Sequence, residues 1–176
     1  MSYLFHKLRF ISLCLLAVGL LPHAANAQDI NELKAALSYN FAKFTQWPEK
    51  AQAKESWQFC YIGEQYRTGF ELFNNKKLAD KLISISELTD LKDINKCHLV
   101  YIGADNRKLL PRLFLAVDKR PILTISDMSG FIDMQGMIEI TPSDNRLQFK
   151  VNLSQIQKSQ LKLSSQVLKL AIEVKR

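Results

Sequence analysis

The sequence predicts an α/β fold: a single domain with a central, mostly parallel sheet, a C-terminal antiparallel hairpin and flanking helices. Three observations support this fold class. Short runs rich in β-branched and aromatic residues alternate with helical segments between residues 57 and 126. Two further strand-like runs follow residue 136, with a turn rich in Pro, Ser, Asp and Asn between them. The chain then closes with apolar residues at helical spacing.

The individual elements follow from periodicity and from helix-breaking residues. We expect a first helix over residues 30–45, because apolar residues recur there every three or four positions and Pro48 prevents its continuation. The expected strands are residues 57–62, 82–86, 98–102, 122–126, 137–140 and 147–151. The other expected helices are residues 69–75, 108–117, 153–160 and 164–174, with a short helix or turn over 87–96.

The first 27 residues have the three parts of a cleavable export signal. A basic stretch from His6 to Arg9 precedes an apolar run over residues 10–21, and Ala25-Asn26-Ala27 is a small-x-small cleavage site. The apolar run is shorter than the roughly 20 residues that span a bilayer. A retained N-terminal anchor is the alternative. We therefore expect a periplasmic protein whose mature domain covers residues 28–176.

Charge and cysteine content constrain the mature domain further. Without Lys7 and Arg9, the 24 basic residues of the whole chain fall to 22 against 17 acidic ones, a net charge of +5. The basic residues are interleaved with acidic ones, so no nucleic-acid partner is expected. Two cysteines remain, Cys60 and Cys97. An even count in an exported protein favours a disulfide, worth roughly 3–4 kcal/mol, over two buried free thiols.

The mature sequence offers no recognisable catalytic constellation. His98 is its single histidine and adjoins Cys97, but neighbours on a strand point to opposite faces, so the two side chains do not form a dyad. No His, Cys, Asp or Glu cluster has metal-ligand spacing, and no phosphate-binding glycine motif occurs. The sequence therefore predicts no enzyme, metal or cofactor.

Two groups of residues are candidates for binding. Ser126, Asp127 and Met128 follow the fourth strand, at the sheet edge where open α/β folds place ligands. These residues could form a small-molecule or peptide groove; the alternative is that they turn the chain and fill the core. Phe41, Phe44 and Trp47 form the aromatic end of the first helix. They could form a docking surface, although aromatic residues at helical spacing more often belong to a core.

A set of short motifs occurs in a characteristic order through almost the whole mature chain. They are Tyr39-Asn40-Phe41-Ala42-Lys43-Phe44 with Trp47-Pro48, Phe59-Cys60 with Ile62-Gly63, Lys96-Cys97-His98, Pro121-Ile122-Leu123-Thr124 with Ser126-Asp127, Gly136-Met137-Ile138, Val151-Asn152-Leu153, and Leu163-Ser164-Ser165-Gln166 with Leu168 to Ala171. No single motif is specific, but the ordered set resembles the YfiR family of periplasmic regulators, which includes HmsC-like proteins.

The resemblance implies an exported, non-enzymatic α/β protein that is often dimeric, with Cys60 and Cys97 matching the family's disulfide pair. YfiR represses an inner-membrane diguanylate cyclase by binding its periplasmic part. An outer-membrane, peptidoglycan-associated lipoprotein relieves that repression by sequestering YfiR. The output is the level of cyclic-di-GMP, and hence biofilm formation and motility.

The resemblance predicts a periplasmic negative regulator of a membrane diguanylate cyclase. The alternative is a periplasmic small-ligand-binding sensory module for another membrane sensor. The sequence also departs from the family at three places. It lacks a second cysteine pair around residues 132–137, and Gln135 and Gln160 stand where glycines are common. These departures bear on loop shape and on redox switching, not on the fold.

Overall fold

The structure is a computed structural model that describes residues 27–143 and 146–176. Its centre is an eight-stranded sheet in the order β10-β8-β7-β6-β5-β2-β4-β3, beside which β1 and β9 form a separate two-stranded pair. The expected signal segment, residues 1–27, lies outside the described residues except for Ala27. Its cleavage therefore stays a prediction.

The strands and helices have the following bounds. The strands are β1 Thr45–Gln46, β2 Trp57–Ile62, β3 Lys77–Leu78, β4 Lys81–Glu87, β5 Leu99–Ile102, β6 Leu123–Ser126, β7 Ile138–Ser143, β8 Arg146–Asn152, β9 Lys162–Leu163 and β10 Glu173–Lys175. The helices are α2 Ala27–Lys43, α3 Glu49–Gln52, α4 Arg67–Glu71, α5 Leu110–Val117, α6 Leu153–Lys158 and α7 Ser165–Leu170, with 3₁₀ turns η1 Glu64–Tyr66, η2 Leu91–Lys96 and η3 Ala104–Leu109.

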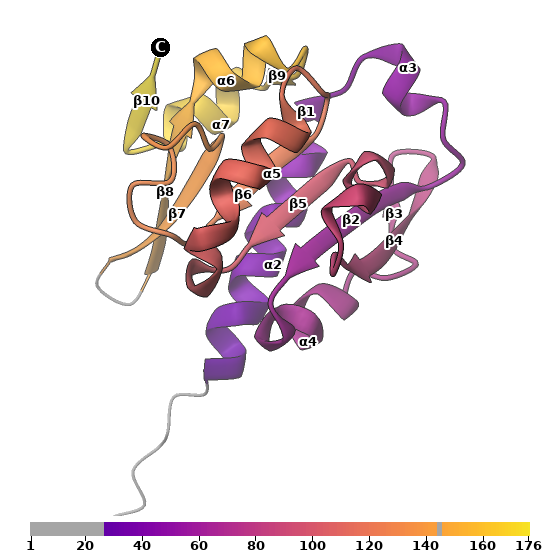
Figure 1. The fold of residues 1–176 in the computed structure, drawn as a ribbon, viewed down its shortest axis with the longest axis horizontal. Helices are drawn as coiled ribbons and strands as arrows, with labels where there is room; N and C mark the ends of the chain where they lie inside the picture. The colour runs from indigo at the N-terminus through magenta and orange to yellow at the C-terminus, as the bar shows by residue number, and fades with distance from the viewer. Residues whose placement is uncertain (1–26, 144–145) are drawn as a thin grey trace, which may run out of the picture.

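The sheet confirms the predicted fold class. The neighbours β4, β2, β5, β6 and β7 pair in parallel, whereas β7 and β8 form the expected antiparallel hairpin. Helical segments lie in the connections from β2 to β4, from β4 to β5 and from β5 to β6, whereas a segment of turns joins β6 to β7. Helices cover both sides of the sheet: α2 runs behind it and α5 lies in front of it (Figure 1). Among the described residues, no helix combines the length and apolar character needed to cross a membrane.

Strict alternation along the central strands sends side chains to two separate cores. In β2, Phe59 and Tyr61 belong to the larger core, and Cys60 and Ile62 to the smaller one. The same alternation divides the four residues of β5. Because both faces are buried, these strands read as continuous apolar runs in the sequence. The larger core includes residues of α2, and the smaller one lies beneath α5.

Most predicted elements are confirmed, but the C-terminal one is wrong in part. The helix expected over 164–174 ends at Leu170, and Glu173–Lys175 forms β10, parallel to β8. The Ile172 amide donates to the Phe149 carbonyl at 3.0 Å, so the tail satisfies the otherwise open edge of β8. The first helix also ends earlier than expected, because Thr45–Gln46 pairs with Lys162–Leu163 in β9.

Candidate functional site

The carboxyl edge of the parallel strands carries a partly buried polar cluster centred on Asp127. β2 and β5 end immediately before Gly63 and Gly103, and β6 ends immediately before Asp127. The Asp127 carboxylate accepts three hydrogen bonds: Oδ1 from the Ala104 amide at 3.0 Å, and Oδ2 from Lys34 Nζ at 2.6 Å and Tyr66 Oη at 3.0 Å. The cluster therefore joins α2, η1, η3 and the end of β6.

Burial strengthens the interactions in this cluster. The side chains of Lys34 and Asp127 are only 15% and 10% exposed, so their ion pair is poorly screened by solvent. Burial, followed by the charge of Asp127, raises the pKa of Tyr66 well above its ordinary value, which keeps its hydroxyl a hydrogen-bond donor. The Tyr66 ring lies directly against Gly103, where an added Cβ would come within 2.3 Å of Tyr66 Cε2.

The three residues predicted at this edge differ in what they do. Ser126 is fully buried; its Oγ donates to the Ile102 carbonyl and accepts from the Met128 amide. Met128 is buried in the smaller core. Asp127 alone reaches the polar cluster, where both of its carboxylate oxygens already accept hydrogen bonds within the chain. The hydrogen bonds of Asp127 thus act as a structural latch: they hold α2, through Lys34, against the edge of the sheet.

The predicted aromatic group divides between core and surface. Phe41 is buried and meets Phe149 edge-on at 4.8 Å, and Trp47 packs on Trp57 with ring centroids 5.0 Å apart. Phe44 is 36% exposed at the end of α2. Trp57 begins β2, so this group lies toward the amino edge of the sheet, and the structure does not bring it together with the Asp127 cluster.

Cys97 and His98 take the opposite directions that strand geometry requires. Cys97 forms a disulfide with Cys60 in the smaller core, with Cα atoms 5.9 Å apart. The buried His98 imidazole accepts from the Gln58 amide at Nδ1 and lies 3.0 Å from the Ala51 carbonyl at Nε2. Burial lowers the pKa of His98 to about 4. The ring is therefore neutral at pH 7, with its proton on Nε2.

A groove that no sequence motif predicts runs along α5. The groove has a volume of about 760 Å³ and is lined mainly by side chains of α5, the preceding turn, the Met134–Gln135 loop and Lys158 of α6. Leu115 on α5 is 81% exposed, the most exposed large apolar side chain among the described residues. Leu110, Leu113 and Val117 form the buried stripe of α5, and Leu115 falls outside it.

No metal centre is built into the described parts of the chain: within 27–143 and 146–176, no three His, Cys, Asp or Glu side chains are grouped to hold an ion.

The sequence matches the model of the family described as YfiR/HmsC-like over residues 31–172, and the chain belongs to this family. That range begins within α2 and ends just before β10, so it contains every other strand of the sheet, the disulfide, the Asp127 cluster and α5. None of the curated proteins compared with this chain matches it.

Two solved structures have a similar fold at low sequence identity. A conserved domain protein from Vibrio cholerae O1 biovar El Tor superposes with a TM-score of 0.57 at 9% identity, covering 82% of this chain and 60% of that one. The ABC domain in complex with L-Trp from Streptococcus pneumonia gives a TM-score of 0.53 at 10% identity, covering 80% and 62%. This chain thus spans less than two thirds of either structure, and the likeness concerns the fold alone.

Proposed function

We propose that this protein is a periplasmic negative regulator that binds the extracytoplasmic part of an inner-membrane diguanylate cyclase and so lowers cyclic-di-GMP. The single observation that carries the proposal is membership of the YfiR/HmsC-like family over residues 31–172. That family is regulatory and non-enzymatic. An outer-membrane, peptidoglycan-associated lipoprotein is the proposed antagonist that sequesters the regulator, and a homodimer is its proposed form.

The disulfide supports the compartment that this function requires. Cys60 and Cys97 are bonded in the structure, and disulfides persist in oxidising compartments such as the periplasm. The export signal over residues 1–27 would deliver the chain there. A regulator in this compartment has access to the extracytoplasmic part of a membrane cyclase and not to its catalytic part, so it acts by binding.

The alternative, a small-ligand-binding module, would place its ligand at the carboxyl edge around Asp127. The structure favours the regulator over this alternative, because the Asp127 carboxylate already accepts hydrogen bonds from Lys34, Tyr66 and the Ala104 amide. A ligand there would have to displace hydrogen bonds that Asp127 already makes within the chain, two of them partly buried. A thermal-shift screen of metabolites tests the alternative, since a ligand of the folded state raises the melting temperature.

Deletion of the gene, followed by measurement of cellular cyclic-di-GMP, tests the proposal. The level should rise on deletion and return to its original value when the gene is supplied in trans. The matched control supplies residues 28–176 without the signal segment, which should not restore the level. An unchanged cyclic-di-GMP level after deletion would refute the proposed function.

A further inference from the structure

We infer that the face of α5 is the surface that binds the partner protein, and that it takes an apolar segment flanked by carboxylates. The inference rests on the proposed function, which it deepens by assigning the contact surface. Its central observation is the juxtaposition of an exposed leucine and an apolar groove with basic side chains that have no carboxylate partner within the described residues.

α5 carries more apolar side chains than its packing against the sheet uses. Leu110, Leu113 and Val117 of α5 are buried and bind the helix to the sheet. Leu115 projects outward, while Phe114 lies partly buried with its ring 5.7 Å from that of Phe131. Exposing Leu115 to water has no benefit for the isolated domain, whereas covering it on binding releases water from apolar surface.

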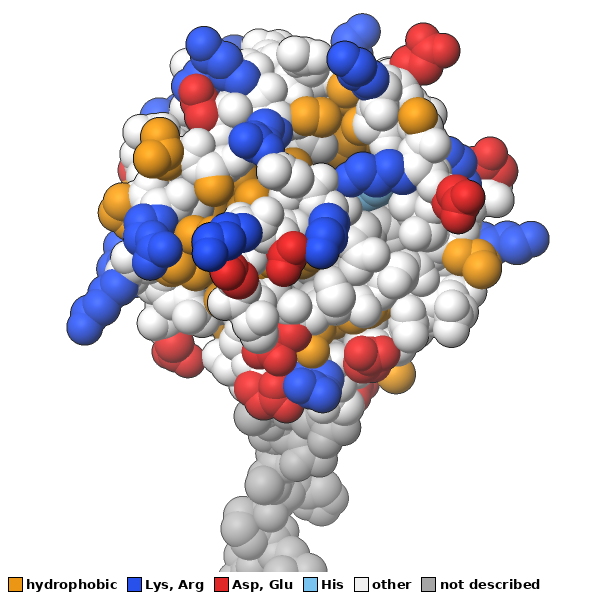
Figure 2. Space-filling model, turned by 45° about the vertical axis from the view of Figure 1, so that its right-hand side comes forward, with side chains coloured by type: hydrophobic (Ala, Val, Ile, Leu, Met, Phe, Trp, Pro, Cys, Tyr) orange, Lys and Arg blue, Asp and Glu red, His pale blue; other side chains and the backbone are white. Residues whose placement is uncertain are grey.

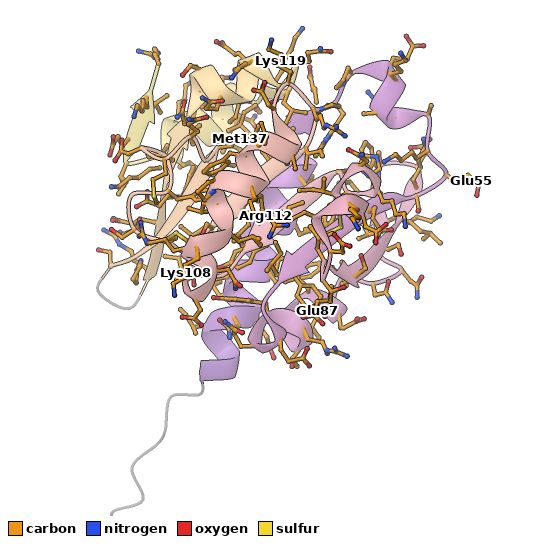
Figure 3. The ribbon with its side chains drawn as sticks, viewed as in Figure 1. Glu55, Glu87, Lys108, Arg112, Lys119 and Met137 are labelled. Atoms are coloured by element: carbon orange, nitrogen blue, oxygen red, sulfur yellow. A yellow bond between two sulfur atoms is a disulfide. The ribbon has the colours of Figure 1, made fainter. Side chains whose placement is uncertain are left out.

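The charged part of this face is strongly basic. The side chains of Arg107, Lys108, Arg112 and Lys119 make no ion pair with any described residue. Lys108 lies in η3, Arg112 in α5 and Lys119 just after the end of α5; all three are labelled in Figure 3. The carboxylate in the groove, Asp118, is already paired with Lys158 at 2.8 Å.

Arg107 is positioned at the groove by neutral acceptors. Its Nη2 donates to the Ser129 carbonyl at 2.8 Å, and Nη1 lies 3.1 Å from Met134 Sδ. The guanidinium is thus oriented while its charge is left uncompensated, which suits it to a carboxylate supplied from outside. Figure 2 shows one face of the molecule, on which hydrophobic side chains lie among Lys and Arg as well as Asp and Glu.

The shape and composition of the face fit a protein segment. Phe, Met and Arg are enriched at the centres of protein interfaces, and all three line this groove. Leu115 lines the groove and is also largely exposed to solvent, so a partner can reach it directly. A partner helix or loop can place one apolar side chain in the groove and its acidic neighbours against Arg107 and Arg112.

The test measures binding of the mature protein, residues 28–176, to the purified periplasmic domain of its host's membrane diguanylate cyclase by calorimetry. The variants are Leu115→Asp and the double variant Lys108→Glu with Arg112→Glu. The matched controls are Leu170→Asp, at a 73% exposed apolar position on α7, and Lys92→Glu on η2. Circular dichroism and the melting temperature verify that every variant is folded.

Both α5 variants should bind at least tenfold more weakly, and the controls should stay within twofold of the unaltered protein. The affinity of the unaltered protein should fall steeply with salt.

If the unaltered protein binds and the α5 variants bind equally well, the surface assignment is wrong while the proposed function stands. If the α5 variants change self-association by light scattering but not cyclase binding, this face is a homodimer interface and the inference is overturned. If the unaltered protein does not bind the domain, the proposed function and this inference fail together.

Discussion

The carboxyl edge of the sheet and the face of α5 are both rich in charged groups, but the two regions use them in opposite ways. At the carboxyl edge, Lys34 and Tyr66 both donate hydrogen bonds to Asp127, and little of the three side chains is exposed. On the α5 face, Arg107 and Arg112 are exposed and lack carboxylate partners among the described residues. A buried polar cluster that satisfies itself holds a fold together, whereas exposed groups that the fold leaves unsatisfied are available to a partner.

The largest expected effect concerns the core beneath α5, where Cys60 and Cys97 cross-link residues 37 positions apart. Replacing Cys97 with Ser should lower the free energy of unfolding by about 4 kcal/mol, because the reduced chain regains loop-closure entropy when it unfolds. Denaturant titration measures the loss, and treatment of the unaltered protein with a reductant should reproduce it. Labelling of both thiols by a maleimide in the unreduced, denatured protein would show that the bond is absent.

The next effect tests whether the Asp127 cluster is a structural latch. Asp127→Ala should lower the free energy of unfolding by about 3 kcal/mol, because it leaves the buried Lys34 ammonium without its counter-charge. Adding Lys34→Met to the same variant should recover part of the loss by removing the unpaired charge. Denaturant titration of both variants makes the comparison. A loss below about 1 kcal/mol would indicate a solvated carboxylate that is free to meet a ligand.

The pH dependence of stability should show the effect of the buried His98. Its pKa is about 4 in the folded protein and about 6.5 in the unfolded chain, so the unfolded chain binds the additional proton between these values. Stability should therefore be lost as pH falls from about 6.5 to 4, by about 3 kcal/mol for this residue. Urea titrations across this range measure it. The His98→Gln variant is the control, and an equal pH slope in both proteins would contradict the assignment.

The smallest effect concerns the two positions where the sequence departs from glycine. Gln135 and Gln160 both adopt positive φ, 79° and 60°, a region that strains side chains with a Cβ. Gln160→Gly should raise the free energy of unfolding by about 0.5–1 kcal/mol, since relief of this strain outweighs the added flexibility of the unfolded chain. Gln157→Gly, within α6, should instead destabilise by about 1 kcal/mol. A lower melting temperature for Gln160→Gly would contradict this explanation.

The central strands could be predicted from the sequence because their apolar runs are local. Residues 57–62 were expected as a strand and form β2 with the same bounds. The last strand, Glu173–Lys175, could not be predicted, because its structure depends on the open edge of β8 rather than on its own pattern.

The sequence predicted where some candidate site residues lie, but not which residues they contact. The sequence placed Asp127 at the carboxyl edge, but its principal partner, Lys34, lies 93 residues away, and no local pattern links the two. Trp47 packs against Trp57 in the core, which is another contact that the sequence does not show. The exposure of Leu115 could not be predicted, because an apolar residue in an amphipathic helix cannot be told from a core residue until the buried stripe of the helix is known.

The most direct test of the whole account is a pull-down with the mature protein, residues 28–176, from solubilised envelopes of its own host, with bound proteins identified by mass spectrometry. The account predicts recovery of a membrane diguanylate cyclase, and a marked loss of that protein when the bait carries Leu115→Asp. Recovery of a different membrane sensor, or of no specific protein, would contradict it.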